Sequence, residues 1–507
     1  MSHYLLEQLL FDAKTVKQLE RRSVASGAVT EFDLMVKAGS FAYAELREAF
    51  GTRKRLHVFC GSGNNGSDGY IIAQLAALDK LTVSLYEFGN AENMSTDAKA
   101  ARQRCVDANV SFEPFTVTTD LSDGVIVDSL LGTGLSGPLR EQVAEAIECI
   151  NSSMLPVLAV DIPSGLCADT GHVDGIAVRA DLTVTFIAAK QGLFTGRGPA
   201  MCGDIVYDSL EIDEAILQRR APATALMSLD DLIDYIPELA VDGHKYQRGH
   251  CMVVGGDHGS GGAAILAAQS SLIAGAGVIS LVSREQHIAA CLTRQPEIMA
   301  CSVASGQQLE PLLDKPSVLV LGPGLGQSSW SEQLLQKAMA VNLPMVVDAD
   351  ALNILSQGRV VCDFSDRRWV LTPHPGEAAR LLGVSVADIE RDRFSAVRAI
   401  QQKYSAVVIL KGAGSLVLGT RSNTINICPY GNPAMATAGM GDLLSGIIGG
   451  LLAQGVDMDT AAELGCCIHG AAADLAVDQR GHRGFVASDI LEFLPTILNQ
   501  YPDAYSE

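Results

Sequence analysis

The segment after an apolar run at Arg55–Cys60 carries an unusual set of polar side chains. Residues Gly61–Gly69 read GSGNNGSDG, which satisfies the G-x-G-x-x-G spacing of a dinucleotide-binding turn. Such a turn uses glycines to bring backbone N–H groups close to phosphate, and it needs no carboxamide or carboxylate groups. The two asparagines and the aspartate therefore indicate contacts to a ligand, although a glycine-rich turn that binds nothing can have the same spacing.

Two further segments of the first half place polar groups after apolar runs. Gly132–Pro138 follows Val125–Asp128 and is glycine-rich enough to bring backbone N–H groups against a phosphate. Asp161 ends the run Val157–Asp161 and precedes a turn that contains proline and glycine. A carboxylate at such a position can give and take a proton. We therefore expect Asp161 to be the catalytic group of the first half.

Three oxygen-bearing side chains, Asn65, Asp128 and Ser164, stand at or just after the ends of apolar runs. If these runs form a parallel sheet, the three side chains converge at one edge. One carboxylate among neutral oxygens suits a weakly charged cation better than Mg²⁺ or Ca²⁺, which recruit more carboxylates. The pattern predicts a potassium site. Taken singly, Asp128 is also explained as a helix cap and Ser164 as a turn residue.

The second half carries its strongest signal at Thr437–Asp442, directly before the apolar helical run Leu443–Leu452. Small residues expose backbone N–H groups at a helix N-terminus, where they can hold a transferring phosphoryl group. Asp442 can accept a proton from a substrate hydroxyl group, or it can simply complement the helix dipole. Lys411–Ser415 lies between two apolar runs and can cradle a nucleotide, but it lacks the order of a Walker A motif.

Other polar residues of the second half also follow apolar runs. His374 comes after Trp369–Leu371 and opens a helix, while Asp348 and Asp350 stand at the end of another run. For isolated residues of these kinds, a structural role is the simpler explanation. The loop Gly322–Gly326 allows a ligand to approach the backbone closely.

These motifs require a scaffold of parallel strands. Short apolar runs alternate with helical stretches in both halves, and runs that are apolar on both faces are typical of strands covered by helices on both sides. We predict an α/β protein of two tandem domains, 1–216 and 230–507, joined by a linker region at 217–229. The first domain is expected to be a Rossmann-like three-layer sandwich. The expected strands are Arg55–Cys60, Leu81–Phe88, Val125–Asp128, Val157–Asp161, Leu182–Ile187, His250–Val254, Val278–Val282, Ser317–Leu321, Pro344–Asp348, Trp369–Leu371, Val407–Leu410 and Ser415–Leu418.

Composition restricts the class of protein. The 507 residues are 48% hydrophobic, which supports two cores and excludes a disordered or fibrous chain. Acidic residues outnumber basic ones by 58 to 37, so binding to nucleic acid or an anionic membrane is disfavoured. Residues 1–15 indicate a short amphipathic helix and not a signal peptide, and no stretch predicts a transmembrane helix. The scattered cysteines are typical of a reducing compartment, so we expect a soluble cytoplasmic protein.

Together, the motifs of the first half resemble the N-terminal domain of the bifunctional NAD(P)H-hydrate repair enzymes. The match rests on Leu34–Gly39, Asn64–Gly69, Asp128 with Gly132–Pro138, and Asp161–Gly165, and it covers about residues 10–215. In that family the domain interconverts the R and S forms of hydrated NADH or NADPH. The resemblance also implies K⁺ at Asn65, Asp128 and Ser164. It implies hydrate contacts at Asn64, Asn65, Gly66, Ser67, Asp68, Gly132, Thr133, Gly134, Leu135, Ser136, Gly137, Pro138 and Asp161.

The second half resembles the ADP-dependent NAD(P)H-hydrate dehydratases over about residues 230–500, and Gly439–Asp442 resembles the signature of ribokinase-like kinases. The resemblance implies a ribokinase-like α/β fold, ADP bound with Mg²⁺, and catalysis by Asp442. The match rests on His244-Lys245, Gly255-Gly256, Gly275–Gly277, Gly322–Gly326, Asp348–Leu352, Thr372–Glu377 and Lys411–Ser415. It implies hydrate contacts at Ala263, Gly324, Gly326, His374 and Asp442, and nucleotide contacts at Lys411, Gly412, Ala413, Gly414, Ser415 and Gly441.

The resemblance implies that the first domain inverts C6 of the hydrate and the second dehydrates the S form with ADP, giving NAD(P)H, AMP and phosphate. A homo-oligomer acting on small molecules is expected. A ribokinase-like small-molecule kinase with an accessory domain shares Gly439–Asp442 but leaves Asn64–Gly69 without a role. A dinucleotide-dependent oxidoreductase, in which Glu87 would be the ribose-binding acid, leaves the second half of the chain without a role. An interaction scaffold in the first half would not need Asp128 or Asp161.

Overall fold

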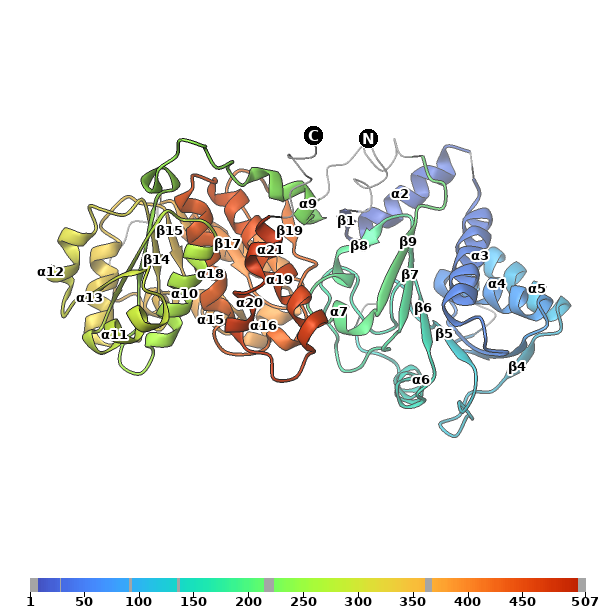
Figure 1. Cartoon of the computed structure of the whole chain (residues 1–507). Coiled ribbons are helices and arrows are strands. Elements are labelled where there is room, and N and C mark those ends of the chain that lie inside the picture. The colour runs from blue at the N-terminus through green and yellow to red at the C-terminus, as the bar shows by residue number, and fades with distance from the viewer. Residues whose placement is uncertain are drawn as a thin grey trace. The chain divides into compact units, whose positions relative to one another are not determined.

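The computed structural model describes residues 8–27, 29–90, 94–134, 137–213, 223–360 and 367–499. The chain divides into two compact units, Met1–Ala225 and Leu226–Glu507, each with an α/β architecture (Figure 1). The division falls inside the region 217–229 that we expected to be a linker. Residues 217–222 of that region lie outside the described residues, and Thr224–Leu226 forms strand β10.

The first unit is built on a parallel sheet with the strand order β4-β3-β2-β5-β6-β7-β9. These strands are β2 (Arg55–Cys60), β3 (Thr82–Glu87), β4 (Ser111–Glu113), β5 (Val125–Ser129), β6 (Val157–Val160), β7 (Leu182–Phe186) and β9 (Asp204–Asp208). From β2 the chain first builds outward through β3 and β4, and then returns to β5 and builds the other way. The carboxyl ends of β2 and β5 therefore form the switch point at which doubly wound sheets bind ligands.

Helices cover both faces of this sheet, as a three-layer sandwich requires. They are α2 (Ala13–Ala25), α3 (Glu31–Phe50), α4 (Asn64–Leu78), α5 (Thr96–Asp107), α6 (Glu141–Ser152) and α7 (Gly198–Met201). Successive strand residues alternate between two cores. Val58 packs in the core that includes α3, α4 and α5, whereas its neighbour Phe59 packs in the core that includes α6. This alternation buries strands on both sides and explains their nearly continuous apolar sequence.

The N-terminal segment differs from our expectation of a helix over residues 1–15. Residues 1–7 lie outside the described part of the chain, and Leu9–Phe11 forms strand β1. Strand β1 pairs in parallel with β8 (Ala189–Lys190) and antiparallel with β10. The helix α2 starts only at Ala13, because Asp12 caps it by accepting the backbone N–H of Thr15 at 2.5 Å. Backbone pairing therefore outweighs the helical hydrophobic pattern here.

The second unit has its own sheet, in the order β13-β12-β11-β14-β15-β16-β17-β18-β19. The strands are β11 (His250–Val254), β12 (Val278–Ser283), β13 (Met299–Ser302), β14 (Val318–Leu321), β15 (Met345–Val347), β16 (Trp369–Leu371), β17 (Val407–Leu410), β18 (Leu416–Leu418) and β19 (Ile425–Ile427). The pairs from β13 to β17 are parallel, and β18 and β19 add antiparallel strands. The switch point lies between β11 and β14.

Three long helices, α10, α18 and α19, share the main core of this unit with the sheet. Gly446 of α18 allows close packing, because a Cβ atom there would lie 2.1 Å from the carbonyl oxygen of Ala267 in α10. None of the helices within the described ranges has the length and apolarity to cross a membrane. The helices are α9 (Leu229–Leu232), α10 (Gly261–Ile273), α11 (Glu285–Arg294), α12 (Gly306–Leu309), α13 (Ser329–Ala338), α14 (Ala349–Ser356), α15 (Pro375–Leu382), α16 (Val386–Arg391), α17 (Arg393–Tyr404), α18 (Met440–Ala453), α19 (Met458–Arg480), α20 (Ala487–Ile490) and α21 (Leu494–Leu498).

Candidate active sites

The switch point of the first unit opens into a pocket of about 970 Å³. Its wall includes the loops after β2 and β5, the residue that follows β6, and parts of α2 and β8. Most of the expected hydrate contacts line it: Asn64, Asn65, Asp68, Gly132, Thr133, Gly134, Pro138 and Asp161. Gly66, Ser67 and Gly137 are not among the lining residues, and Leu135 and Ser136 lie outside the described residues.

The glycine-rich turn sets the start of α4. Gly63 is the N-cap residue, so Asn64 and Asn65 lie in the first turn at the pocket wall. A Cβ atom at Gly66 would lie 1.9 Å from the carbonyl oxygen of Gly61, so the turn requires glycine there. The buried Ser67 hydroxyl group donates to the Gly63 carbonyl at 3.2 Å. Gly66 and Ser67 therefore shape the turn from behind.

Asp161 follows β6 and has a φ of 66°, which is uncommon for a residue other than glycine. Its carboxylate forms an ion pair with the ammonium group of Lys190, whose side chain is 1% exposed. Lys190 also donates to the Thr185 hydroxyl oxygen at 3.0 Å and to the Phe186 carbonyl at 2.9 Å. All three N–H bonds of the ammonium group are thus used. Lys190 therefore fixes the position of the Asp161 carboxylate at the pocket wall.

Two further carboxyl groups, those of Asp68 and Glu20, line the same pocket. Burial raises the pKa of Asp68 well above its ordinary value, and the charges of Asp161 and Glu20 raise it further. Burial also raises the pKa of Glu20, with the negative charges of Glu31 and Asp161 adding to the effect. The pocket therefore combines one carboxylate that is paired with a lysine and two carboxyl groups that resist ionisation.

The three residues expected to bind potassium meet around the peptide groups of Leu131. Asn65 Nδ2 donates to the Leu131 carbonyl at 2.8 Å, and the Leu131 N–H donates to the Ser164 hydroxyl at 2.9 Å. Ser164 donates to both oxygens of Asp128, from its hydroxyl at 2.6 Å and from its N–H at 2.7 Å. Burial raises the pKa of Asp128 to about 6. Asn65 Oδ1 is buried without a hydrogen-bond partner among the described residues.

In the second unit, Lys411 follows β17 and lies against one carboxylate that follows β15 and another in the first turn of α15. Its Nζ donates to Asp348 Oδ1 at 2.8 Å and lies 3.9 Å from Glu377 Oε2. The other oxygen of Asp348 accepts the Ser445 hydroxyl group of α18 at 2.8 Å. Burial opposes a charge on Lys411, but Asp348 and Glu377 outweigh it and raise the pKa of the ammonium group. Asp348 thus anchors a lysine and makes no side-chain cap bond to α14.

The N-terminus of α18 approaches this ion pair. Gly439 precedes the helix with a φ of 95°, in the left-handed region that favours glycine. A Cβ atom at Gly441 would lie 3.0 Å from Lys411 Nζ, so the first turn lies directly against the lysine. Burial and the charge of Asp348 raise the pKa of Asp442 to about 6, although Lys411 lowers it. Asp442 is therefore ionised at neutral pH and has the pKa of an effective general base.

His374 stands at the start of α15, beside the same carboxylates. Its Nδ1 accepts the backbone N–H of Gly376 at 2.9 Å, which assigns the ring hydrogen to Nε2. Nε2 lies 3.4 Å from Glu377 Oε1. Burial, Lys411 and Arg380 lower the pKa of His374, so the ring is neutral at pH 7. Burial raises the pKa of Glu377 to about 7. His374 can therefore donate one neutral N–H bond.

The loop Lys411–Ser415 is shaped by a buried arginine. Arg393 donates to the carbonyl oxygens of Leu410 and Lys411, each at 3.2 Å, and its guanidinium group lies against Gly412. Gly412 and Ala413 are exposed. The loop therefore has a supported base and an accessible tip, as a phosphate-binding loop requires. Gly414 and Ser415 complete the turn that leads into β18.

The expected hydrate contacts Ala263, Gly324 and Gly326 lie at the switch point of the second unit. A Cβ atom at Gly324 would lie 3.1 Å from the Ala263 Cβ, and one at Gly326 would lie 2.9 Å from Asp257 Oδ2. The Gly326 N–H donates to Asp350 Oδ2 at 2.9 Å. The charge of Asp350 contributes to the raised pKa of Asp442 after burial and Asp348, so the expected base is within electrostatic range of this loop.

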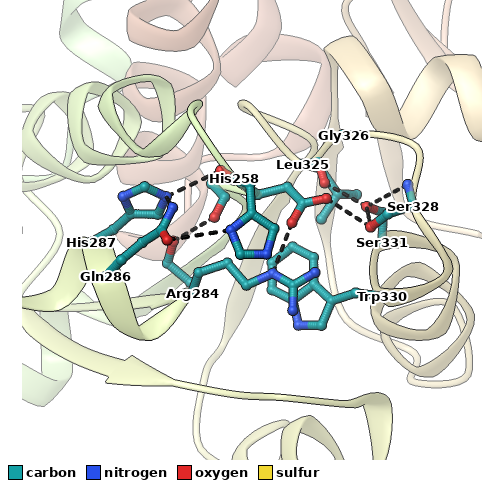
Figure 2. A network of polar contacts seen from close by, with 12 residues as sticks. His258, Arg284, Gln286, His287, Leu325, Gly326, Ser328, Trp330 and Ser331 are labelled. Atoms are coloured by element: carbon teal, nitrogen blue, oxygen red, sulfur yellow. Dashed lines mark hydrogen bonds and ion pairs between the residues drawn. The ribbon is translucent and has the colours of Figure 1, made fainter.

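A polar network around Asp257 also supports that loop. Asp257 accepts Arg284 Nε at 2.8 Å and the Ser328 hydroxyl at 2.7 Å, while its N–H donates to the Gly324 carbonyl at 2.7 Å. Figure 2 shows Arg284 beside Trp330, and the guanidinium carbon lies 4.1 Å from the indole ring centre. The network connects the loops after β11, β12 and β14, and it fixes the position of the Gly324–Gly326 backbone.

Comparisons with known proteins agree in both halves. One family model, described as NAD(P)H-hydrate dehydratase, matches residues 251–496, and another, described as the YjeF-related protein N-terminus, matches residues 31–192. A bifunctional NAD(P)H-hydrate repair enzyme of Coxiella burnetii is 42% identical over 97% of this chain and 99% of its own length. The Escherichia coli enzyme of that name is 39% identical over 96% and 93%. The chain belongs to the bifunctional NAD(P)H-hydrate repair enzyme family.

The fold of the second unit is also found among solved structures. A ribokinase-like superfamily protein of Enterococcus faecalis aligns with a TM-score of 0.51 and 25% identity. The alignment covers 55% of this chain and 96% of the other. The ribokinase-like fold expected for the second half is thereby confirmed. The α/β class and the two-domain organisation of the repair enzyme family are confirmed as well.

The structure adds site residues to which the sequence motifs assigned no role, although Glu377 itself lies in the motif Thr372–Glu377. In this repair enzyme, Lys190 and Glu20 complete the carboxylate pocket of the first unit, and Glu377 and Ser445 complete the lysine site of the second. Lys190 has a detectable signal, because it follows the apolar run Leu182–Ile187 by three residues. Glu20 has none, since it lies on an amphipathic helix and its role depends on where that helix packs.

Glu87, the candidate ribose-binding acid, is committed elsewhere. Its carboxylate accepts two hydrogen bonds from Arg102, at 2.7 and 3.1 Å, and one from the Tyr70 hydroxyl at 2.8 Å. It is also absent from the residues that line the pocket. These contacts give Glu87 a structural role, and they remove one of the two features, Gly61–Gly66 and Glu87, that suggested a dinucleotide-dependent oxidoreductase.

Proposed function

We propose that the first unit epimerises hydrated NADH and NADPH at C6, and that the second unit dehydrates the S epimer with ADP. The observation that carries this proposal is the full-length similarity to bifunctional repair enzymes together with a cluster of ionisable groups in each unit. Cytoplasmic location, homo-oligomerisation and the lack of nucleic-acid or membrane partners stay predictions from the sequence.

For epimerisation, the substrate must lose and regain a hydroxyl group next to the ring nitrogen. We assign Asp161 to the proton transfers, because it faces the pocket and Lys190 fixes its carboxylate. The N–H groups of the first turn of α4 and the glycine loop 132–134 would hold the phosphate groups of the dinucleotide. Asn64 and Asn65 add side-chain amides near the same surface.

We also propose that K⁺ binds in the first unit to Asn65, Asp128 and Ser164. Asp128 is fully buried, and the hydrogen bonds it accepts from Ser164 and the N–H of Leu130 come from neutral groups. Burying a carboxylate without a counter-charge is costly, so a cation is favoured there. The unpartnered Asn65 Oδ1 supplies a further oxygen. Bound K⁺ would fix the loops that form the pocket.

This proposal predicts that epimerisation is lost when the protein is exchanged into tetramethylammonium and returns with K⁺ but not with Mg²⁺. Asn65→Ala should raise the K⁺ concentration needed for half-maximal epimerisation, whereas Asn109→Ala, on the surface after α5, should not. Epimerisation that is unchanged after exhaustive exchange would refute the potassium site while leaving the epimerase assignment intact.

For dehydration, hydroxide is a poor leaving group, and phosphorylation of the C6 hydroxyl solves this problem. Asp442 would accept the hydroxyl proton while the oxygen attacks the terminal phosphoryl group of ADP, and AMP leaves. Lys411 and the N–H groups at the start of α18 would stabilise the negative charge on the transferring group. Phosphate then departs with the C6–O electron pair, and loss of the C5 proton yields NAD(P)H.

Mg²⁺ is proposed to enter the second unit with the nucleotide. Among the described residues there is no group of three or more His, Cys, Asp or Glu side chains placed to hold a metal ion. Mg²⁺ commonly binds through substrate phosphates and its own waters, and there it neutralises phosphate charge. His374, with its single neutral N–H, is assigned to the hydrate, and the loop Lys411–Ser415 is assigned to the nucleotide.

The decisive experiment uses the full chain and a mixture of both hydrate epimers. Recovery of dihydronicotinamide absorbance should be complete with ADP and absent without it. Consumption of only the S epimer would refute the epimerase assignment. The main alternative, a ribokinase-like small-molecule kinase, predicts instead that a phosphorylated product survives turnover, whereas the proposed reaction releases one phosphate for each NAD(P)H formed.

A further inference from the structure

Asp68 is the pocket group of the first unit that the mechanism above leaves without a chemical role. It lies on α4 and faces the cavity of about 970 Å³ together with Asp161 and Glu20. Within the described part of the chain, its carboxyl group has no hydrogen-bond or ion-pair partner. Asp161, by contrast, is held by Lys190. The two aspartates therefore offer different chemistry to a molecule in the same cavity.

The charges around Asp68 determine that difference. Burial raises the pKa of Asp68 most, followed by the negative charges of Asp161 and Glu20, while Lys190 lowers it. The Lys190 ammonium group is already bound to Asp161, Thr185 and Phe186, so it cannot turn to Asp68. Burial and these two negative charges thus favour the protonated form of Asp68. The other charged groups that line the cavity are Lys14 and Lys17 of α2, Glu31 of α3, Asp97 of α5, Arg140 before α6, and Asp169.

Inversion at C6 needs a proton donor and a proton acceptor, because the hydroxyl group leaves from one face of the ring and water returns to the other. A carboxylate that is ion-paired with lysine can accept a proton but has none to give. A neutral carboxylic acid can give one. We propose that Asp68 is the general acid of the epimerase site and that Asp161 is its general base. This inference rests on the proposed epimerase function.

The proposed epimerisation consists of the loss of water at C6 and its return to the other face. The C6–O bond breaks, its electron pair stays on oxygen, and that oxygen takes the Asp68 proton and leaves as water. The N1 lone pair forms a C6=N1 double bond. Water then adds to the opposite face, the π pair returns to N1, and Asp161 accepts the surplus proton. Exchange with solvent restores both aspartates. The reverse direction uses the same groups with their roles exchanged.

The test measures interconversion of the purified epimers without ADP, in the full chain. Asp68→Asn keeps the size of the side chain and removes the proton, so kcat for epimerisation should fall by roughly 10²- to 10⁴-fold while KM changes little. Asp68→Glu should restore part of the rate. Asp107→Asn, which alters an exposed carboxyl group at the end of α5 that does not line the cavity, should have a small effect. ADP-dependent dehydration of the S epimer should stay normal in all three variants.

The pH profile separates a chemical role from a structural one. Wild-type epimerisation should decline at alkaline pH as Asp68 loses its proton, and the residual activity of Asp68→Asn should lack this decline. A wild-type rate in Asp68→Asn, a loss confined to KM, or an unchanged alkaline decline in that variant would each overturn the proposal. If the wild-type chain does not interconvert the epimers at all, the proposed function itself fails, and the two failures are thereby distinguished.

Discussion

The two units build their sites from the same three kinds of group. Each places a lysine against an aspartate that follows a strand: Lys190 with Asp161 in the first unit and Lys411 with Asp348 in the second. Each also places a second aspartate in the N-terminal half of a helix whose N-cap residue is glycine. This residue is Asp68 on α4 in the first unit and Asp442 on α18 in the second.

The second aspartates differ in the charges that face them. Asp68 faces Asp161 and Glu20, and its pKa is raised well above the ordinary range, chiefly by burial. Burial also raises the pKa of Asp442, but the positive charge of Lys411, which lies against the first turn of α18, keeps that pKa at about 6. The surroundings of Asp68 therefore favour the protonated form, which can give a proton, whereas Asp442 is ionised at neutral pH and can accept one. The comparison shows that neighbouring charge, more than residue type, selects acid or base chemistry.

The largest expected effect comes from Asp161→Asn. Asparagine cannot accept the proton of the returning water, so epimerisation should be abolished, while ADP-dependent dehydration of the S epimer continues at the wild-type rate because its groups lie in the other unit. Chromatographic separation of the epimers measures the first activity and absorbance measures the second. Circular dichroism checks the fold, because Lys190 is left buried without its partner. Equal loss of both activities in a folded protein would contradict separate sites.

The next effect concerns the base of the second unit. Asp442→Asn should lower dehydration by roughly 10²- to 10⁴-fold, the usual contribution of a positioned proton acceptor. ADP affinity should change little, since Lys411 and the glycine-rich loop remain. The control is Asp478→Asn, an exposed position on α19. An acid that only complements the helix dipole is worth about 0.3–1 kcal/mol. A nearly normal rate with a slightly lower melting temperature would therefore make Asp442 a structural residue.

The strands that position these sites could be predicted because they are buried on both faces and therefore read as continuous apolar runs. Arg55–Cys60 and His250–Val254 have the same bounds in the structure as in the prediction. Strands at sheet edges, such as β4 and β13, lack that pattern because solvent reaches one side. Strand β1 was hidden for another reason, since its two buried residues also fit one face of a helix.

The groups that belong to glycine-rich motifs could be found for a comparable reason. Asn65, Asp161 and Asp442 lie next to turns whose backbone geometry restricts the sequence. The groups that set their protonation could not be given that role in this way, although Lys190 and Asp348 both follow apolar runs. Lys190, Glu20 and Asp348 act through distance in space, and neither their spacing nor their neighbours in the sequence indicates which carboxylate they face. The pairing of groups, and hence the assignment of acid and base, required the fold.

A third prediction compares the pH dependence of the two activities. Asp442 must be ionised to act as a base, and burial raises its pKa to about 6. Dehydration should therefore be constant above about pH 7 and fall by up to about tenfold per pH unit below pH 6. Asp348, Asp350 and Lys411 are the charged groups that influence it. Single-turnover rates over this range measure the effect. The residual dehydration rate of Asp442→Asn should lack this decline at acid pH. An unchanged decline in that variant would show that another group causes it.

The smallest expected effect tests how the two switch points differ. The first unit leaves its switch point open as a pocket, whereas in the second the Asp257 network supports the loop that carries Gly324 and Gly326. Ser328→Ala removes the hydrogen bond to Asp257 and the 3.1 Å contact with the Ser331 hydroxyl group at an exposed position, which should together cost about 1 kcal/mol. That cost lowers the melting temperature of a unit of this size by about 2–4 °C. The KM for the hydrate should rise a few-fold, with kcat nearly unchanged.

Ser329→Ala is the matched control, because Ser329 is the adjacent exposed residue at the start of α13. The pH dependence gives a second measure of the same network. The hydrogen bonds from Ser328 and Arg284 lower the pKa of Asp257 despite its burial, so its stabilising contribution is present above its unfolded pKa of about 3.9. That contribution is lost as the pH falls through the lower pKa of the folded state. As the pH falls from the unfolded pKa of Asp257 to its folded pKa, the melting temperatures of Ser328→Ala and the wild type should therefore converge. The melting temperature of Ser329→Ala should follow that of the wild type throughout. A KM that rises equally in both variants would show that the loop is held by its backbone alone, and that the two switch points differ only in shape.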